Sequence, residues 1–267
     1  MKILGILNIT EDSFYDGGLY LKETSAIAQA NRLIEEGADI IDIGAQSSNI
    51  HSHVISAEAE WQRLLPVIEL LKEKKVKISI DTFKTDVIRK CLEIGIDYIN
   101  NISAFNESEA LEVLGEYRDN LPELIIMFSH SQGNIAQLGS QLTLETIWED
   151  IFYFFDKKLE ELQKYGVSQD KIILDPGMGF FLGDDPELSF TVLRGLGRFR
   201  EKFGRILISV SRKSFLGTAI GGLPPKDRGI ATVIAELYAY IQGVDYLRTH
   251  DPLSLKQAIT IWDRINP

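Results

Sequence analysis

The strongest constraint on this chain is the repeated alternation of a short apolar run with a longer amphipathic segment. The apolar runs predict eight strands, at residues 2–9, 39–44, 76–81, 98–102, 123–130, 171–175, 206–211 and 245–250. The segments between and after them repeat apolar residues at intervals of three and four, which predicts helices, among them residues 57–73, 186–204 and 252–265. Several of these segments end at a glycine, as helices often do: Gly37, Gly95, Gly166, Gly204 and Gly243.

Strands that alternate with helices pair in parallel, because each crossover helix returns the chain to the same end of the sheet. Eight such units in 267 residues match a (β/α)8 TIM barrel, which is the α/β fold that we expect. A doubly wound open sheet is the alternative. No linker or low-complexity tract interrupts the pattern, so we expect a single domain over residues 1–267.

The composition restricts the class of partner. The chain has 39 acidic against 28 basic residues and a formal net charge of -11, which disfavours nucleic acids and anionic membrane surfaces. No apolar run approaches the roughly 18–20 residues of a membrane span, and the first residues do not have the pattern of a signal peptide. Cys91 is the one cysteine, so no internal disulfide can form. We therefore expect a cytoplasmic protein with small-molecule partners.

Polar side chains stand at the end of every expected strand, where a barrel of this kind carries its chemistry. They are Asn8, Asp42, Asp81, Asn100, Asn101, His130, Asp175, Lys213, Arg248 and His250. A single residue of this type is more often a helix cap or a turn residue. Carboxylates, amides and cations gathered at one end of a barrel suit a ligand with a polar heterocycle and an anionic tail.

The stretch "ILISVSRKSFLG" (206–217) ends its expected strand with two adjacent cations. Because side chains alternate along a strand, Ser211 and Lys213 should share the face toward the barrel mouth. Arg212 should then lie outside the mouth or at its rim.

The same alternation places Arg248 and His250 together, where both could bind phosphate oxygens. A salt bridge from this pair to Asp245 or Asp251 is the alternative. Known phosphate loops do not explain the pattern, since the residue before Lys213 is arginine rather than the glycine of a P-loop, and no GxGxxG follows a strand.

The two histidines of "NIHSHVIS", His51 and His53, could bind a metal. No further ligand with suitable spacing stands near them, so solvated loop residues are the better interpretation.

Six stretches resemble the dihydropteroate synthases of folate biosynthesis and occur in that family's order. They are "GILNITEDSFYDGG" (5–18), "ISIDTFK" (78–84), "YINNIS" (98–103), "LDPGMGF" (174–180), "SVSRKSFLG" (209–217) and "LRTHDP" (247–252). The resemblance implies a TIM barrel, usually a homodimer, that joins 6-hydroxymethyl-7,8-dihydropterin diphosphate to p-aminobenzoate and releases pyrophosphate in the presence of Mg2+. Three of the stretches are especially similar to the family's sulfonamide-insensitive branch.

The resemblance also implies roles for individual residues. Asp81, Asn100, Asp175 and Lys213 would bind the pterin, and Asn8, Arg248 and His250 would bind the diphosphate, with Asn8 as the Mg2+ ligand. Phe180, Ser211 and Ser48 would lie beside p-aminobenzoate. Asp81, Lys213, Arg248 and His250 would carry the catalytic roles, without a protein nucleophile.

The sequence departs from the family mainly on the p-aminobenzoate side. Gln46, Ser48 and Asn49 stand where the family usually has Glu, Thr and Arg, which removes a cation from a loop that covers the substrates. Ser129, Ser131 and Asn101 replace two methionines and an aspartate. We therefore expect low sulfonamide sensitivity, with Phe215 and Gly217 helping to exclude the drug.

Two other functions remain open. One is a non-catalytic paralogue that binds pterin. The other is a barrel that transfers a methyl group from methyltetrahydrofolate to a cobalamin protein, although such barrels lack the "SRKS" and "RTHD" stretches.

Overall fold

The expected strands form one parallel sheet in the computed structural model, which describes residues 1–9, 19–46, 54–131 and 139–267. The strands are β1 (Lys2–Asn8), β2 (Ile40–Gly44), β3 (Lys77–Asp81), β4 (Tyr98–Asn101), β5 (Glu123–Met127), β6 (Ile172–Asp175), β7 (Leu207–Ile208) and β8 (Tyr246–Thr249). Their order is β6-β5-β4-β3-β2-β1-β8-β7, and β1 pairs with both β2 and β8. The TIM barrel is confirmed, and the open doubly wound sheet is wrong.

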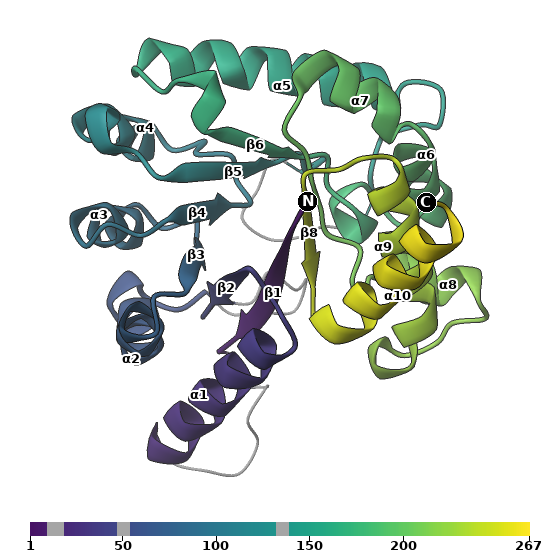
Figure 1. Ribbon diagram of the computed structural model, residues 1–267. Helices are drawn as coiled ribbons and strands as arrows, with labels where there is room; N and C mark the ends of the chain where they lie inside the picture. Colours follow the sequence, from purple (N-terminus) through teal and green to yellow (C-terminus); the bar gives the residue numbers. More distant parts are fainter. Residues whose placement is uncertain (10–18, 47–53, 132–138) are drawn as a thin grey trace.

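Helices lie around the outside of the strands, as Figure 1 shows. They are α1 (Leu19–Glu35), α2 (Ala57–Glu73), α3 (Thr85–Glu93), α4 (Ser108–Glu116), α5 (Ile147–Lys164), α6 (Pro186–Arg194), α7 (Leu196–Phe203), α8 (Ser214–Ala219), α9 (Gly229–Ile241) and α10 (Pro252–Ile265). The five glycines expected to end helices all have positive φ angles. Within the described ranges, no helix is both long enough and apolar enough to cross a membrane.

Two helical features differ from the prediction. The single helix expected over residues 186–204 is divided into α6 and α7 at Gly195. A Cβ atom at Gly195 would stand 2.4 Å from the ring of Trp148, so this close contact requires glycine. The short helix α8 was not expected, and it begins immediately after Lys213, where the predicted strand 206–211 proves to be only Leu207–Ile208.

The barrel closes through a weak seam between β6 and β7. These strands share one isolated bridge, Leu174 to Ile206, where the other neighbours form ladders of two or more registered pairs. A backbone hydrogen bond of 3.1 Å from Leu174 N to Arg205 O crosses at the same place. The ring of strands is therefore nearly, but not continuously, hydrogen-bonded.

The alternation of side chains divides the core into two parts. The inner cluster fills the barrel with one residue from each of seven strands: Leu4, Ile40, Tyr98, Ile125, Ile173, Leu207 and Tyr246. The larger outer cluster lies between strands and helices and includes Ile41, Ile43, Ile208 and Val210. An inward residue two positions after a member of the inner cluster must consequently lie one layer nearer the carboxyl ends of the strands.

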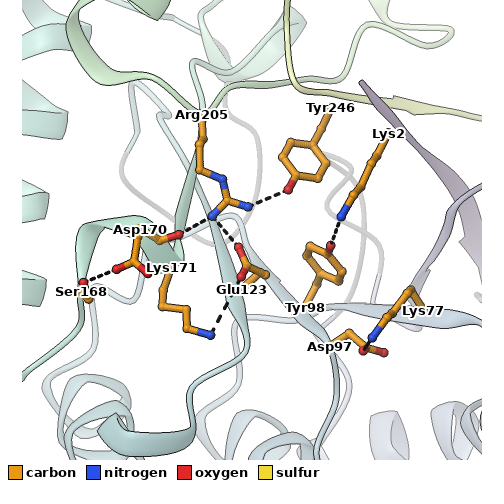
Figure 2. A network of polar contacts seen from close by, with 10 residues as sticks. All are labelled: Lys2, Lys77, Asp97, Tyr98, Glu123, Ser168, Asp170, Lys171, Arg205 and Tyr246. Carbon is orange, nitrogen blue, oxygen red and sulfur yellow. Dashed lines mark hydrogen bonds and ion pairs between the residues drawn. The ribbon is translucent and has the colours of Figure 1, made fainter.

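Polar contacts join the amino ends of several strands, as Figure 2 shows. Arg205 donates from Nη2 to the Tyr246 hydroxyl (2.7 Å), and its Nη1 pairs with the Glu123 carboxylate. Lys2 Nζ donates to the Tyr98 hydroxyl at 3.2 Å, and the two tyrosine rings meet edge to face with centroids 6.3 Å apart. These contacts fill the barrel at the amino ends of the strands. A site that admits a ligand is therefore expected at the carboxyl ends.

Candidate active site

The site lies one layer above the inner core, at the carboxyl ends of the strands. Inward positions there carry polar side chains on β2, β3, β4, β6 and β8, namely Asp42, Asp81, Asn100, Asp175 and Arg248. Asp42, Asn100 and Asp175 are buried, with 0%, 6% and 5% of their surface exposed. A layer of apolar residues is thus followed by a layer of charged ones, which is the arrangement that a TIM barrel uses for chemistry.

Arg248 connects two carboxylates from neighbouring strands. Its Nε donates to Asp42 Oδ2 at 2.5 Å and its Nη2 to Asp81 Oδ2 at 2.7 Å. Asn100 donates from Nδ2 to the same Asp42 oxygen at 3.3 Å. The three charged side chains are 16% (Arg248), 0% (Asp42) and 22% (Asp81) exposed, so the guanidinium neutralises two largely buried acids.

The expected alternative for Arg248, a salt bridge to Asp245 or Asp251, is wrong. Asp245 accepts the backbone N–H of Ile206 at 3.0 Å. Asp251 caps helix α10 by accepting from the backbone N–H of Ser254, also at 3.0 Å. Both carboxylates therefore serve local backbone structure, and Arg248 remains within the mouth of the barrel.

Lys213 and Asp175 place opposite charges across the seam of the barrel. Lys213 Nζ donates to the Met178 carbonyl at 3.1 Å and lies 4.7 Å from the centre of the Phe181 ring. Burial lowers the pKa of Lys213 to about 8, against the raising effect of Asp175. Burial raises the pKa of Asp175 to about 6, although Lys213 and a 2.8 Å hydrogen bond from Gly177 N lower it. At neutral pH both groups are mainly ionised.

Asp81 is close to the midpoint of its titration at neutral pH. Burial raises its pKa to about 7, and the Asp42 and Glu60 carboxylates act in the same direction, while Arg248 and Lys213 oppose them. A carboxyl group with a strongly shifted pKa at the mouth of a barrel is a candidate for chemistry rather than for stability alone.

The two cations of "SRKS" have different environments, as the sequence indicated. Arg212 is exposed, and its backbone N–H donates to Thr232 Oγ1 at 3.0 Å. The reason is not simple strand alternation, because β7 ends at Ile208. Arg212 instead has a φ of 57°, and this left-handed residue turns the chain so that Lys213 enters the mouth.

His250 is held by Ser211. Its ring Nδ1 lies 3.0 Å from Ser211 Oγ, and its backbone N–H donates to the same oxygen at 3.1 Å. Burial lowers the pKa of His250 to about 3, and the nearby Arg212 and Arg248 lower it further. The imidazole is therefore neutral. Ser211, which the resemblance places beside p-aminobenzoate, uses its hydroxyl within the protein.

Asn8 ends β1 at the mouth and is exposed. A Cβ atom at Gly44 would make ordinary contacts of 3.5 Å with Asp81 Cβ and 3.7 Å with Asn8 Oδ1, so both side chains border Gly44 at the mouth. In the described ranges, no group of three or more His, Cys, Asp or Glu side chains could hold a metal ion by itself.

Beside Lys213 lies an aromatic side chain to which the family resemblance assigns no role. Phe180 is half-buried in the short 3-10 turn Gly179–Phe181, but the ring that lies over Lys213 is that of Phe181. Phe181 packs against Phe83, Ile102 and Met127, which form a small separate apolar cluster. Strand alternation could not identify Phe181, because it lies in a turn. Asp42 was visible as a polar strand end but received no role.

Other expected residues lie elsewhere. Ser48, Asn49, His51 and His53 fall outside the described residues. Phe215 is 3% exposed and packs edge to face on Phe190, with centroids 5.1 Å apart, so it is a core residue, and its part in excluding a drug stays a prediction.

Gly217 and Asn101, two other residues singled out in the sequence, have structural roles. Gly217 is tightly covered by Leu223 and Arg228. Asn101 Oδ1 accepts hydrogen bonds from Ser103 N, Ser103 Oγ and Phe105 N, which organises the turn after β4.

The fold and the mouth together define a TIM-barrel enzyme whose mouth carries a largely buried, mixed-charge group of side chains suited to a small polar ligand. The family model described as pterin binding enzyme matches residues 4–250. The chain is 45% identical to dihydropteroate synthase type-3 of Escherichia coli, covering 97% of each protein, and 39% identical to the type-2 enzyme of the same species, covering 97% and 94%.

Solved structures agree with these relatives. A dihydropteroate synthase from Clostridium difficile with pteroic acid superposes with a TM-score of 0.87 at 33% identity, covering 99% of this chain and 96% of that one. The Xanthomonas albilineans enzyme in complex with 7,8-dihydropteroate gives 0.84 at 28% identity, covering 99% and 93%. The chain belongs to the dihydropteroate synthase family of pterin-binding enzymes, and it is a transferase of folate biosynthesis.

Proposed function

We propose that this enzyme joins 6-hydroxymethyl-7,8-dihydropterin diphosphate to p-aminobenzoate, giving 7,8-dihydropteroate and pyrophosphate. The observation that carries the proposal is the buried group of Asp81, Asp175, Lys213 and Arg248 at the mouth of a barrel in this family. Solved relatives are described with p-aminobenzoate and with 7,8-dihydropteroate, which supports the same two substrates here.

The pterin fits the part of the pocket between β3 and β7. A pterin edge presents ring N–H groups and an amine, for which the oxygens of Asp175 and Asn100 are matching acceptors. The Lys213 ammonium, held at the Met178 carbonyl, is a donor for the pterin carbonyl oxygen. Because these groups are buried, each matched contact contributes strongly and each missing one is costly.

The diphosphate would meet Arg248 and His250. Arg248 carries a permanent charge that can stabilise the negative charge developing on the leaving pyrophosphate. His250 is neutral and so can offer a single ring N–H. Asp81, on the other side of Arg248, can stabilise positive charge on the pterin as the bond to the diphosphate breaks. The amine of p-aminobenzoate then attacks the pterin methylene carbon, and no protein nucleophile is required.

Magnesium fits this mouth as an ion with few protein ligands. Asn8 offers one exposed neutral oxygen, and Mg2+ is commonly bound by one or two protein oxygens together with water and phosphate. When bound, the ion would neutralise charge on the diphosphate. The contribution of the chain would be the exposed Asn8 amide oxygen at the end of β1.

The test is pyrophosphate release from dihydropterin diphosphate with Mg2+, in the presence and absence of p-aminobenzoate. Release that requires p-aminobenzoate and yields dihydropteroate is the expected result. Tight pterin binding without product would instead favour the non-catalytic paralogue. Asn8→Ala tests the proposed metal ligand. This variant should raise the Mg2+ concentration that is needed for half-maximal activity.

We also propose low sensitivity to sulfonamides. The half-buried Phe181, packed on Phe83, Ile102 and Met127, gives a rigid apolar wall next to Lys213 that could reject a ligand larger than p-aminobenzoate. The sulfonamide inhibition constant should greatly exceed the Michaelis constant for p-aminobenzoate. If the two constants were similar, sulfonamide exclusion would have to be abandoned.

A homodimer through α9 and α10 is a further proposal. These adjacent helices expose large apolar side chains, including Ile230 (82%), Ile234 (64%) and Ile265 (70%). An apolar groove of about 430 Å³ lies between them, lined by Leu237, Ala258 and Trp262 among others. Light scattering should give twice the chain mass, and Ile234→Asp should give a monomer.

A further inference from the structure

The turn that brings Lys213 into the mouth has a backbone conformation that is unusual for its residue type. Arg212 has a φ of 57°, and residues other than glycine rarely adopt this left-handed conformation, because Cβ then approaches the following carbonyl oxygen. Arg212 also lies beyond the end of β7 at Ile208, so strand pairing does not determine its conformation. Other contacts must therefore stabilise the turn.

Two side chains at the start of α9 bind both backbone polar groups of Arg212. Thr232 Oγ1 accepts the Arg212 N–H at 3.0 Å, and Nη1 of Arg228 donates to the Arg212 carbonyl oxygen at 2.7 Å. The N–H belongs to the peptide unit before the Cα atom of Arg212, and the carbonyl belongs to the peptide unit after it. The two contacts therefore fix both φ and ψ of the left-handed residue from a neighbouring helix.

Both of these side chains are held by their own surroundings. Arg228 Nε donates to the Leu223 carbonyl at 2.7 Å, and the guanidinium lies so close over Gly217 that a Cβ atom there would have no room. Thr232 is 4% exposed, so its hydroxyl is a buried acceptor. Because their positions are fixed independently of Arg212, these side chains can impose the conformation of the turn.

The turn determines where Lys213 points. Lys213 N donates to the Val210 carbonyl at 3.1 Å, which closes the turn around Arg212. Lys213 Nζ then reaches the Met178 carbonyl, also at 3.1 Å. A right-handed or extended Arg212 would rotate the next peptide unit and direct the Lys213 side chain elsewhere. The place of the ammonium in the mouth thus depends on contacts that are made at α9.

We propose that Arg228 and Thr232 are positioning residues that hold Arg212 left-handed and so keep the Lys213 ammonium in the mouth. Both act through the backbone of Arg212 rather than on a substrate. The value of this contact for catalysis rests on the proposed function, in which Lys213 donates to the pterin carbonyl oxygen. The conformation of the turn is a property of the free protein and does not depend on that function.

Calorimetry with 6-hydroxymethylpterin tests the proposal. Arg228→Met should weaken pterin binding about tenfold, which is the effect of losing the charged hydrogen bond that holds the Arg212 carbonyl. Thr232→Val keeps the shape of the side chain and should weaken binding about threefold, as for a neutral hydrogen bond. Lys226→Met is the matched control, since it removes an exposed cation from the same loop, and it should bind as the wild type does.

Double variants separate positioning from a general loss of stability. In the Lys213→Met background, Arg228→Met should change pterin affinity by less than about twofold, because the group that it positions is already absent. Arg212→Gly should restore most of the affinity of Arg228→Met, since glycine adopts a positive φ without the steric cost. Arg212→Ala removes the same side chain and should not restore it. Equal rescue by both would show that Arg228 does not hold the conformation of Arg212.

Amide exchange in the free protein separates this inference from the proposed function. The Lys213 N–H, bonded to the Val210 carbonyl, should exchange about tenfold faster in Arg228→Met and at the wild-type rate in Lys226→Met. Wild-type exchange in folded Arg228→Met, or equal losses of affinity with and without Lys213, would overturn the proposal. If Arg228→Met does not fold, Thr232→Val decides the same question. If Lys213→Met left pterin binding unchanged, the role of Lys213 in the proposed function would fail, and the exchange rates would still decide whether α9 holds the turn.

Discussion

Replacing Arg248 by methionine should destabilise the enzyme in a manner that depends on pH. Arg248 neutralises Asp42 and Asp81 through contacts of 2.5 and 2.7 Å. Removing one partner of a buried ion pair costs about 3–5 kcal/mol. The lower part of this range applies here, because Asp81 is 22% exposed and can take up a proton.

The direction of this pH dependence follows from the pKa of Asp81. In the wild type it is about 7, above the value of about 3.9 in an unfolded chain. Between these values the folded state binds more protons than the unfolded state, so the free energy of unfolding falls as pH rises. Loss of Arg248 raises the folded pKa further. The variant therefore continues to lose stability above pH 7, where the wild type has levelled off.

Thermal unfolding at pH 6 and pH 8 measures this effect. At pH 8 we expect a loss of about 3 kcal/mol, which corresponds to roughly 6–12 °C for a domain of this size, and about half of that at pH 6. Arg212→Met is the matched control, since it removes an exposed arginine, and its loss should be small at both pH values. Equal losses for Arg248→Met at pH 6 and pH 8 would refute the reasoning.

Three further outcomes are expected. Lys213→Met should weaken pterin binding by about 10–100-fold in calorimetry while the protein stays folded, because one charged hydrogen bond is lost and a buried ammonium is removed; unchanged affinity would exclude Lys213 from the pocket. Pterin affinity should fall as pH drops from 7 to 5, since Asp175, with a pKa of about 6, loses its charge, and Asp175→Asn should bind weakly and keep only the part of this dependence that follows the pKa of Asp81, about 7. Phe215→Ala should lower the free energy of unfolding by about 3–5 kcal/mol, as for other buried aromatic residues. Phe181→Ala should lower it by less and should also lower the sulfonamide inhibition constant. A lower inhibition constant for Phe215→Ala but not for Phe181→Ala would contradict the assignment of the apolar wall to Phe181.

The barrel could be predicted because period-2 and period-3.6 patterns are local properties of the sequence. Helices α2 and α10 begin and end where the apolar spacing placed them, at Ala57–Glu73 and Pro252–Ile265. The break at Gly195 could not be predicted in this way. It depends on the ring of Trp148, which is distant along the chain.

The residues of the site show the same difference between what local patterns predict and what depends on distant parts of the chain. Asp81, Asn100 and Asp175 were found because each is a polar residue at or next to the carboxyl end of an expected strand. Phe181 was missed because it lies in a turn, where strand alternation gives no prediction. The placement of Lys213 was predicted correctly, but the left-handed Arg212 rather than strand alternation produces it.

The seam between β6 and β7 gives the substrate a mechanical role. Asp175 stands on one side of it and Lys213 on the other, and the two strands share only the Leu174–Ile206 bridge. A pterin bound to both side chains would connect β6 to the segment after β7 and so link the two sides of the seam. Amide hydrogens beside the gap should then exchange slowly only while the enzyme is loaded, so occupancy could be read from the backbone of Arg205 to Ile208 without following catalysis.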